Sequence, residues 1–218
     1  FEKAIEEAGK ILNIKGSVIP VTTTKTRLHM VLKSGKVLEG EKEVHASTEI
    51  EQGYTTISLE PKAEADPHAL DTIKEADVII IGPGGLYTSL IPNLLVYGLP
   101  EAIKASKAKK VFIMNLMNKN GQTSKFTTTS YLKEIGRFLG KDIFDRIIIN
   151  NSIPQKELIE IYAKEGALII NDMADDKRVI SCNLLSDEIK EAPKKDFLKN
   201  RNLIRHDSEK LAVALIGV

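Results

Sequence analysis

Residues 79–93, IIIGPGGLYTSLIPN, join an apolar run to a turn that is rich in glycine and hydroxyl side chains. Gly84 and Gly85 have no Cβ, so the backbone N–H groups of this turn can approach an oxyanion closely. Thr88 and Ser89 add hydroxyl donors. A helix that starts directly after the turn directs its positive end toward the same place. These residue types, in this order, predict a phosphate-binding turn.

Other features of this stretch limit the prediction. The Gly-Pro-Gly-Gly sequence is not a GxGxxG fingerprint, and no Gly-Lys-Ser/Thr follows, which disfavours P-loop kinases and ATPases. A tight strand-to-helix turn whose glycines only allow packing stays open as the alternative. Pro92 removes a backbone donor, so we expect a kink or a restart of the helix near Asn93. The candidate phosphate-binding residues are Gly82, Pro83, Gly84, Gly85, Leu86, Tyr87, Thr88, Ser89 and Asn93.

Two further polar turns follow apolar runs. The segment NLMNKNGQTSKF comes after VFIM, and Asn150-Asn151-Ser152 comes after RIII. Amide and hydroxyl side chains can bind base edges or sugar hydroxyls without charge, although a surface turn with Asn120-Gly121 at its tip is the alternative. Ligands of open α/β sheets lie outside the carboxyl ends of the strands, so we expect the three turns to converge. The candidate residues of this second ligand loop are Asn115, Met117, Asn118, Gln122 and Thr123.

The sequence assigns no catalytic residue and no metal site. No Ser-His-Asp order and no Cys-His pair is present, and Cys182 in VISCNLL fits a small buried hydrophobe. Asp172, Asp175 and Asp176 fit a solvated loop better than a site for a hard cation. His29 has no second His or Cys at ligand spacing. A divalent cation is therefore not supported by the sequence.

The elements that must position these turns fall into two stretches. After an amphipathic helix over 1–14, residues 17–61 read as short strands, and from 66 to 218 strands and helices alternate. Such alternation predicts crossover connections and a mainly parallel, doubly wound sheet. The segments expected as strands of the first stretch are 17–22, 26–35, 36–46 and 55–61. The segments expected as strands of the second are 77–82, 110–115, 146–150, 167–171 and 178–185, of which the first three should be adjacent and parallel.

The totals exclude several classes of partner. Lys and Arg number 31 and Asp and Glu 30, so a net charge of +1 attracts neither nucleic acid nor an anionic membrane. No apolar run reaches the roughly 18 residues of a membrane span. With one cysteine there is no intramolecular disulfide, which fits a reducing compartment. We expect a cytoplasmic protein, and a homodimer stays open. The start at Phe1 suggests a fragment of a longer protein.

The block ADVIIIGPGGLYTSLIPNLLVYGLPEAIKAS closely resembles the Gly-Pro-Gly-Ser-Leu-Tyr-Thr-Ser…Pro-Asn-Leu-Leu-Val block of the gluconeogenesis factor family. That family, also called uncharacterised protein family 0052, belongs to the CofD-like phospholactate transferase superfamily. The segments LKSGKVLEGEKEV, VFIMNLMNKNGQT and IRHDSEKLA resemble three further segments of the family, so the resemblance covers most of the chain.

The resemblance implies one Rossmann-like, three-layer α/β domain over 1–218, with a β-rich antiparallel insertion near the N-terminus. It also implies a nucleotide-linked small molecule as ligand. In the gluconeogenesis factor branch this is a nucleotide sugar of the UDP-N-acetylglucosamine type, with a role in cell shape and envelope synthesis. In the transferase branch a guanosine-linked phospholactate donor meets a deazaflavin acceptor. We expect a regulator without turnover, and a transferase is the alternative.

This sequence departs from the family pattern at several positions. Gly85 stands where the family has serine, and Gln122 stands where it has glutamate. The lost carboxylate puts a metal or ribose contact at 122 in doubt. The Gly-rich loop and crossover unit that open the family fold are not recognisable in this sequence, which also predicts a fragment.

Overall fold

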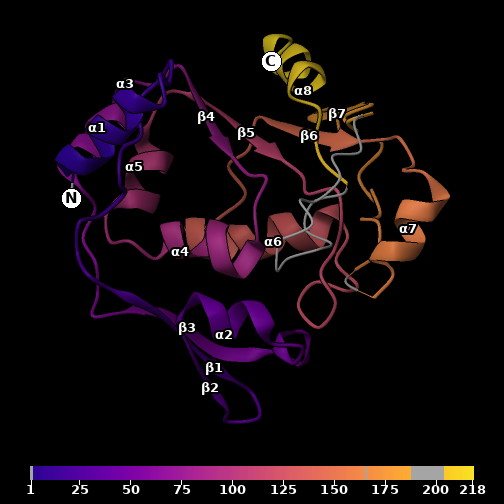
Figure 1. Cartoon of the computed structure of the whole chain (residues 1–218), viewed down its shortest axis with the longest axis horizontal. Helices are drawn as coiled ribbons and strands as arrows, with labels where there is room; N and C mark the ends of the chain where they lie inside the picture. The colour runs from indigo at the N-terminus through magenta and orange to yellow at the C-terminus, as the bar shows by residue number, and fades with distance from the viewer. Residues whose placement is uncertain (1, 165, 188–203) are drawn as a thin grey trace.

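The computed structural model describes residues 2–164, 166–187 and 204–218. Its centre is a four-stranded parallel sheet in the order β4-β5-β6-β7 (Figure 1). The strands are β4 (Val78–Ile81), β5 (Lys109–Ile113), β6 (Arg146–Asn150) and β7 (Val179–Cys182). The prediction that 77–82, 110–115 and 146–150 are adjacent parallel strands is confirmed, with Ile81 beside Phe112 and Phe112 beside Ile147.

Both faces of the sheet are covered at its central strands β5 and β6, which explains their continuous apolar runs, whereas Val78 and Ile80 of the edge strand β4 are exposed. Phe112 and Ile147 pack on the side of α6, whereas Val111 and Ile113 pack toward α8. Figure 1 shows α8 on one side of the sheet and α4, α5 and α6 on the other, so the predicted three-layer α/β arrangement is confirmed. The helices of this region are α3 (Pro67–Glu75), α4 (Ile91–Leu94), α5 (Leu99–Ala105), α6 (Thr128–Leu139), α7 (Lys156–Tyr162) and α8 (Ser208–Ile216).

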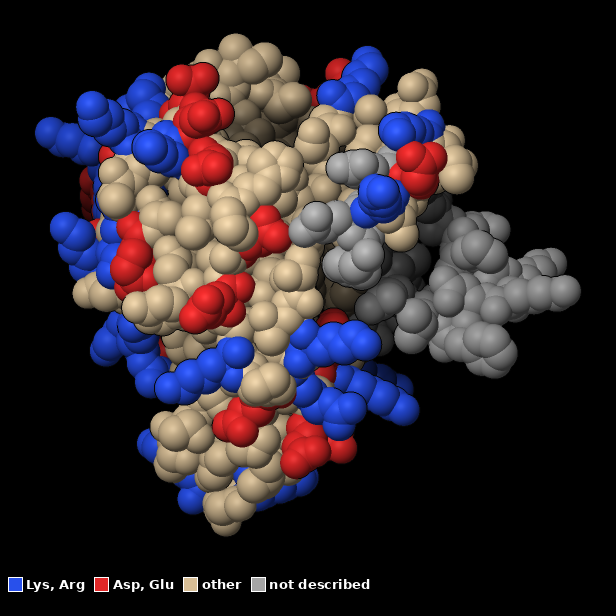
Figure 2. All heavy atoms as spheres, turned by 90° about the vertical axis from the view of Figure 1, so that its left-hand side faces the viewer, with Lys and Arg blue, Asp and Glu red and all other residues tan. Residues whose placement is uncertain are grey.

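A second sheet lies beyond the layer of α4 and α6 and forms a smaller lobe (Figures 1 and 2). It is antiparallel, in the order β2-β1-β3. Its strands are β1 (Arg27–Leu32), β2 (Val37–Glu39) and β3 (Tyr54–Glu60). Leu28, Met30 and Leu32 alternate with more exposed residues, as expected of a strand with one covered face. This confirms the antiparallel insertion near the N-terminus. Figure 2 shows Lys and Arg side chains gathered where the two lobes meet.

Three expected strands are wrong. Residues 17–22 are irregular and follow α1 (Glu2–Ile11). Of 36–46, only 37–39 form β2, because Gly40, at φ 82°, turns the chain into α2 (Gly40–Ala46), where Val44 is buried. Residues 167–171 join neither sheet. Instead Leu168 and Ile170 form isolated bridges to Met117 and Thr127, so the segment is paired with the second ligand loop and the start of α6.

Two helix boundaries involve proline and its neighbours. Asp66 caps α3 by accepting a hydrogen bond from the His68 N–H at 2.9 Å, and Pro67 occupies the first turn of that helix. Near Pro92 the chain forms a π-helical turn over Leu86–Leu90 and then α4. Proline therefore lies in the first turn of the second segment, where its missing N–H leaves no broken helix bond.

A buried polar network joins the two lobes. The Glu134 carboxylate, on α6, accepts a hydrogen bond from the Tyr54 hydroxyl of β3. Arg137 donates to both Glu134 oxygens, at 3.1 and 2.9 Å, and to the Tyr54 hydroxyl at 3.0 Å. The Tyr87 ring meets the Tyr54 ring edge-on, with centroids 5.7 Å apart. Glu134 is only 8% exposed, so its charge depends on these partners.

We predict that alkaline pH destabilises the fold. Burial, and then the hydrogen bond and charge of Glu134, raise the pKa of Tyr54, and burial also raises the pKa of Tyr87 and that of Tyr131, the latter to about 12. Near pH ~10 these phenols ionise in the unfolded chain but stay protonated in the native state. The unfolded state then binds fewer protons, so the free energy of unfolding falls as pH rises further.

Urea unfolding at a series of pH values between 7 and 11 measures this fall. It should be smaller in Tyr54→Phe, which removes one half-buried phenol, than in the control Tyr97→Phe, whose ring is exposed. An equal fall in both variants would contradict the assignment to the Tyr54 phenol.

Candidate phosphate-binding site

The glycine turn begins where β4 ends. Gly82 has φ 86°, and a Cβ there would lie 2.6 Å from the Ile113 carbonyl oxygen of the neighbouring strand. Only glycine combines that backbone conformation with so close an approach. The turn is therefore pressed against β5 directly outside the carboxyl end of the sheet, where ligands of α/β folds bind.

The side chain of Asn115 clamps the turn from the end of β5. Its Oδ1 accepts the Gly84 N–H at 3.0 Å, and its Nδ2 donates to the Gly84 carbonyl at 2.8 Å. The first and second predicted turns are thus joined to each other, in line with the expectation that the polar turns converge at one edge of the sheet. The same bonds occupy the Gly84 N–H, so this amide is not among those free to meet an anion.

The open amides begin at the next residue. The π-helical turn starts from Gly85, which has no side-chain cap, and Ser89 and Leu90 both donate to the Gly85 carbonyl, at 2.7 and 3.0 Å. Within the described parts of the chain, no acceptor takes the remaining first-turn amides, which are the N–H groups of Gly85, Leu86, Tyr87 and Thr88. Consecutive unpaired amides of this kind form a concavity that suits an anion.

One hydroxyl group stands directly beside these amides. A Cβ at Gly85 would lie 2.3 Å from Thr88 Oγ1, so the threonine hydroxyl occupies the space that a side chain at 85 would fill. Pro83, Gly85 and Ser89 are exposed and Thr88 is half-buried, so solvent reaches the turn.

The other predicted residues of this turn act in different ways. Leu86 and Tyr87 are buried, so only their backbones face the turn. Asn93 is exposed, and its Nδ2 donates to the Ser89 carbonyl at 2.6 Å, which fastens the π-helical turn to α4.

The second ligand loop is held in place mainly by hydrogen bonds of its own polar side chains. Asn118 donates to the Phe126 carbonyl at 2.9 Å, and Thr123 Oγ1 accepts the Lys119 N–H at 2.9 Å. Gln122 donates to three carbonyls at the end of α2, namely Val44, His45 and Ser47 at 2.8, 3.1 and 3.3 Å. Asn118, Gln122 and Thr123 are buried and Met117 is half-buried. Direct ligand contacts by these side chains stay a prediction.

Two residues outside the predicted set also lie at the carboxyl ends of the strands. Asn150 accepts the Leu184 N–H at 3.0 Å and donates to the Ser152 carbonyl at 2.7 Å, so it clamps the third turn as Asn115 clamps the first. His206 hydrogen-bonds to the backbone of Met114, next to Asn115, and burial lowers its pKa. Its Nε2 atom is buried and has no partner among the described residues. In the sequence, only the resemblance of the segment IRHDSEKLA to the family pointed to His206.

Two of the aspartates and the cysteine singled out in the sequence have roles in the fold: the aspartates bind neighbouring groups and the cysteine is half-buried. Asp172 accepts the Thr129 N–H at 3.0 Å, and Asp176 pairs with Arg178 at 2.8 Å. Burial raises the pKa of the half-buried Cys182 thiol, which disfavours the reactive thiolate. The described residues contain no group of three His, Cys, Asp or Glu side chains that could hold a metal ion. They also contain no helix long and apolar enough to cross a membrane.

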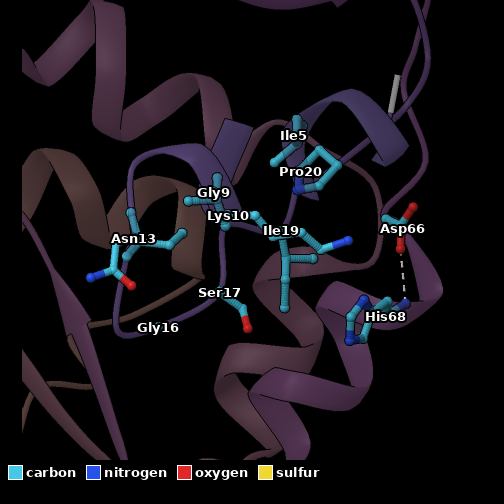
Figure 3. Close-up of a pocket in the computed structure, with 12 residues that line it drawn as sticks. Ile5, Gly9, Lys10, Asn13, Gly16, Ser17, Ile19, Pro20, Asp66 and His68 are labelled. Atoms are coloured by element: carbon cyan, nitrogen blue, oxygen red, sulfur yellow. Dashed lines mark hydrogen bonds between the residues drawn. The ribbon is translucent and has the colours of Figure 1, made fainter. Parts of the chain in front are cut away.

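A cavity of about 590 Å³ lies elsewhere, between α1, the irregular segment 16–20 and the start of α3 (Figure 3). Two of its charged lining residues are engaged, since Asp66 caps α3 and Lys10 pairs with Glu7 at 2.7 Å. None of its described lining residues belongs to the three turns. The glycine turn therefore remains the candidate site.

Known proteins are similar to this chain in sequence and in fold. The sequence profile of the family described as 2-phospho-L-lactate transferase CofD matches residues 1–190. The gluconeogenesis factor of Bacillus subtilis is 33% identical over 219 residues, covering 100% of this chain and 66% of that protein. A relative from Aquifex aeolicus is 40% identical over 167 residues, covering 76% of this chain and 51% of that protein.

The fold comparison agrees with the sequence comparison. The crystal structure of a member of uncharacterised protein family 0052 from Bacillus halodurans superposes with a TM-score of 0.82 at 31% identity. It covers 99% of this chain and 66% of that one. The chain spans between about half and two thirds of the length of the relatives it matches. With a profile match over most of its length and relatives that share its fold, this chain belongs to the gluconeogenesis factor family of the CofD-like superfamily.

Proposed function

We propose that the protein binds a nucleotide-linked metabolite of the nucleotide-sugar type, with its phosphate groups on the turn Gly82–Ser89. The observation that carries this proposal is the set of open amides at the start of the π-helical turn, at the carboxyl edge of a parallel sheet. Hydrogen bonds from such amides to a charged oxygen contribute about 1.5–3 kcal/mol each. Thr88 adds a hydroxyl beside them.

The rest of the ligand would extend across the ends of β5 and β6. Asn115 and Asn150 are engaged with the backbone, so they shape the crevice rather than offer free donors. The buried Nε2 of His206 is a polar atom without a protein partner among the described residues, and we assign it to the ligand side of the crevice. A cytoplasmic regulator that responds to a nucleotide sugar, in control of cell shape and envelope synthesis, fits this design.

A transferase is the second candidate, because the matching profile is that of a phospholactate transferase. Transfer of a phospholactyl-type group needs an acceptor held beside the phosphates and a group that handles the acceptor's proton. The glycine turn carries no such group, since its side chains are apolar or hydroxyl. We therefore favour binding without turnover.

The hydroxyl of Thr88 should contribute to affinity and not to folding. Thr88→Val keeps the shape of the side chain but removes the donor, so the affinity for UDP-N-acetylglucosamine should fall by about 1–3 kcal/mol. Isothermal titration calorimetry measures the affinity, and thermal unfolding of the free protein should be nearly unchanged. Thr72→Val is the matched control, since Thr72 donates to His68 on α3. Equal affinities of Thr88→Val and the wild type would remove Thr88 from the site.

Gln122, in contrast to Thr88, should contribute to folding rather than directly to ligand affinity. Gln122→Ala removes a donor that three carbonyls at the end of α2 share; those of Val44 and His45 keep the Ser47 N–H and the Lys119 Nζ. The loss of this buried donor should lower the free energy of unfolding by about 1–3 kcal/mol. Urea unfolding measures this change. If the variant is as stable as the wild type but binds UDP-N-acetylglucosamine more weakly, Gln122 is a ligand residue instead.

Turnover separates the two candidate functions. The protein should be incubated with UDP-N-acetylglucosamine, and separately with a guanosine-linked phospholactate donor and a deazaflavin acceptor, while mass spectrometry follows the products. We expect both mixtures to stay unchanged. Product formed in excess over protein, and lost in Thr88→Val, would replace the regulator with the transferase.

A further inference from the structure

The turn Gly82–Ser89, which is the phosphate cradle of the proposed function, is held to the protein interior by one of its own residues. Tyr87 contributes an open N–H to the turn, while its side chain is only 3% exposed and points away from it into the core. Its ring stands edge-on to that of Tyr54, with centroids 5.7 Å apart, and the Glu134 carboxylate accepts a hydrogen bond from the Tyr54 hydroxyl. A movement of Glu134 or Tyr54 would therefore displace the backbone that carries the open amides.

Stability alone gives little reason for a buried carboxylate at this position. Removing charges from water is costly, and well-packed apolar residues often stabilise such a site equally well. Glu134 has two hydrogen-bond partners, namely Tyr54 on β3 and Arg137 on its own helix, and the Tyr54 ring in turn packs edge-on against Tyr87 of the π-helical turn. Each hydrogen bond restricts direction as well as distance, so together they fix the relative positions of these elements.

The π-helical turn itself needs such support. Its carbonyl at Gly85 accepts two N–H groups, from Ser89 and Leu90, and π-helical turns are rare and concentrate at functional sites. A relaxation of this turn to α-helical geometry would redirect the amides at its start. The held side chain of Tyr87 opposes that relaxation.

We propose that Glu134 is a positioning residue for the phosphate cradle, and that it couples the three-stranded sheet to the cradle through Tyr54 and Tyr87. The proposal rests on the proposed function as far as the ligand is concerned. The part that concerns the geometry of the turn does not depend on the ligand. Figure 1 shows the layer of α4 and α6 between the two sheets, which is the path that this coupling takes. A partner or ligand that moves β3 would thereby alter the affinity of the cradle.

Three variants and one control test the coupling. Glu134→Gln keeps the shape but removes the charge, Tyr87→Phe removes the phenol, and the double variant combines both changes. Lys133→Gln is the control, because Lys133 is the exposed neighbour of Glu134 on α6. Hydrogen exchange of the backbone, with UDP-N-acetylglucosamine absent, reports the geometry of the turn. Calorimetry with UDP-N-acetylglucosamine reports affinity.

We expect Glu134→Gln to weaken binding by about 3- to 30-fold and to raise exchange over residues 85–90 selectively. Tyr87→Phe should do the same, and the double variant should be no worse than the stronger single variant, because both changes break one path. Additive losses, or exchange raised equally throughout α6, would reduce Glu134 to a general contributor to folding and overturn the proposal.

Failure of the proposed function gives a different pattern. If the wild type binds no UDP-N-acetylglucosamine, the ligand assignment fails, while the exchange data still decide whether Glu134 holds the turn. If Glu134→Gln does not fold, Tyr54→Phe removes one partner and leaves the carboxylate in place. Unchanged exchange over 85–90 in a folded Tyr54→Phe would exclude coupling from β3.

Discussion

The hydrogen bonds between Asn115 and Gly84 are the contact on which the candidate site depends. One amide side chain satisfies both backbone groups of a residue in the turn, and so it joins the ends of β4 and β5. The turn can therefore leave the sheet abruptly at Gly82, against the carbonyl of Ile113, and still begin a helical segment with unpaired amides. Without the clamp, those amides would have no fixed direction.

The same device recurs along the carboxyl edge of the sheet. Asn150 holds the third turn, and Asn118 and Gln122 hold the second loop against Phe126 and α2. Uncharged amides suit this task because each carries both a donor and an acceptor, and a backbone turn needs both. The polar turns are thus mainly a rigid frame, and the groups that we propose for the ligand are backbone amides, Thr88 and the His206 Nε2, which has no partner among the described residues.

Much of the fold follows from sequence patterns. The apolar runs VIII, VFI and RIIIN predict adjacent parallel strands, and those of β5 and β6 are buried on both faces of the sheet. The glycine turn is predictable from composition and position. The role of the amide side chains is not, because a ligand donor and a backbone clamp have the same residue type. The difference lies in contacts between residues 31 or more positions apart, such as Gly84 with Asn115 and Val44 with Gln122.

Local misreadings have equally specific causes. Residues 40–46 continue the apolar residues of 37–38 with charged residues and Val44, which resembles an edge strand, but the chain turns into a helix at Gly40, whose φ is positive. The network of Glu134 had no sequence signal, since its tyrosines come from β3 and from the π-helical turn. Only the folded arrangement brings a glutamate of α6 between them, and with it a link between the second sheet and the cradle.

The most direct measurement of the central claim is a nuclear magnetic resonance titration of backbone amides with UDP-N-acetylglucosamine, with N-acetylglucosamine alone as the comparison. If the cradle binds phosphate groups, the amide resonances of Gly85, Leu86, Tyr87 and Thr88 should shift with the nucleotide sugar and stay unchanged with the free sugar. Shifts confined to residues far from this turn, or equal shifts with both compounds, would contradict a phosphate cradle at the end of β4.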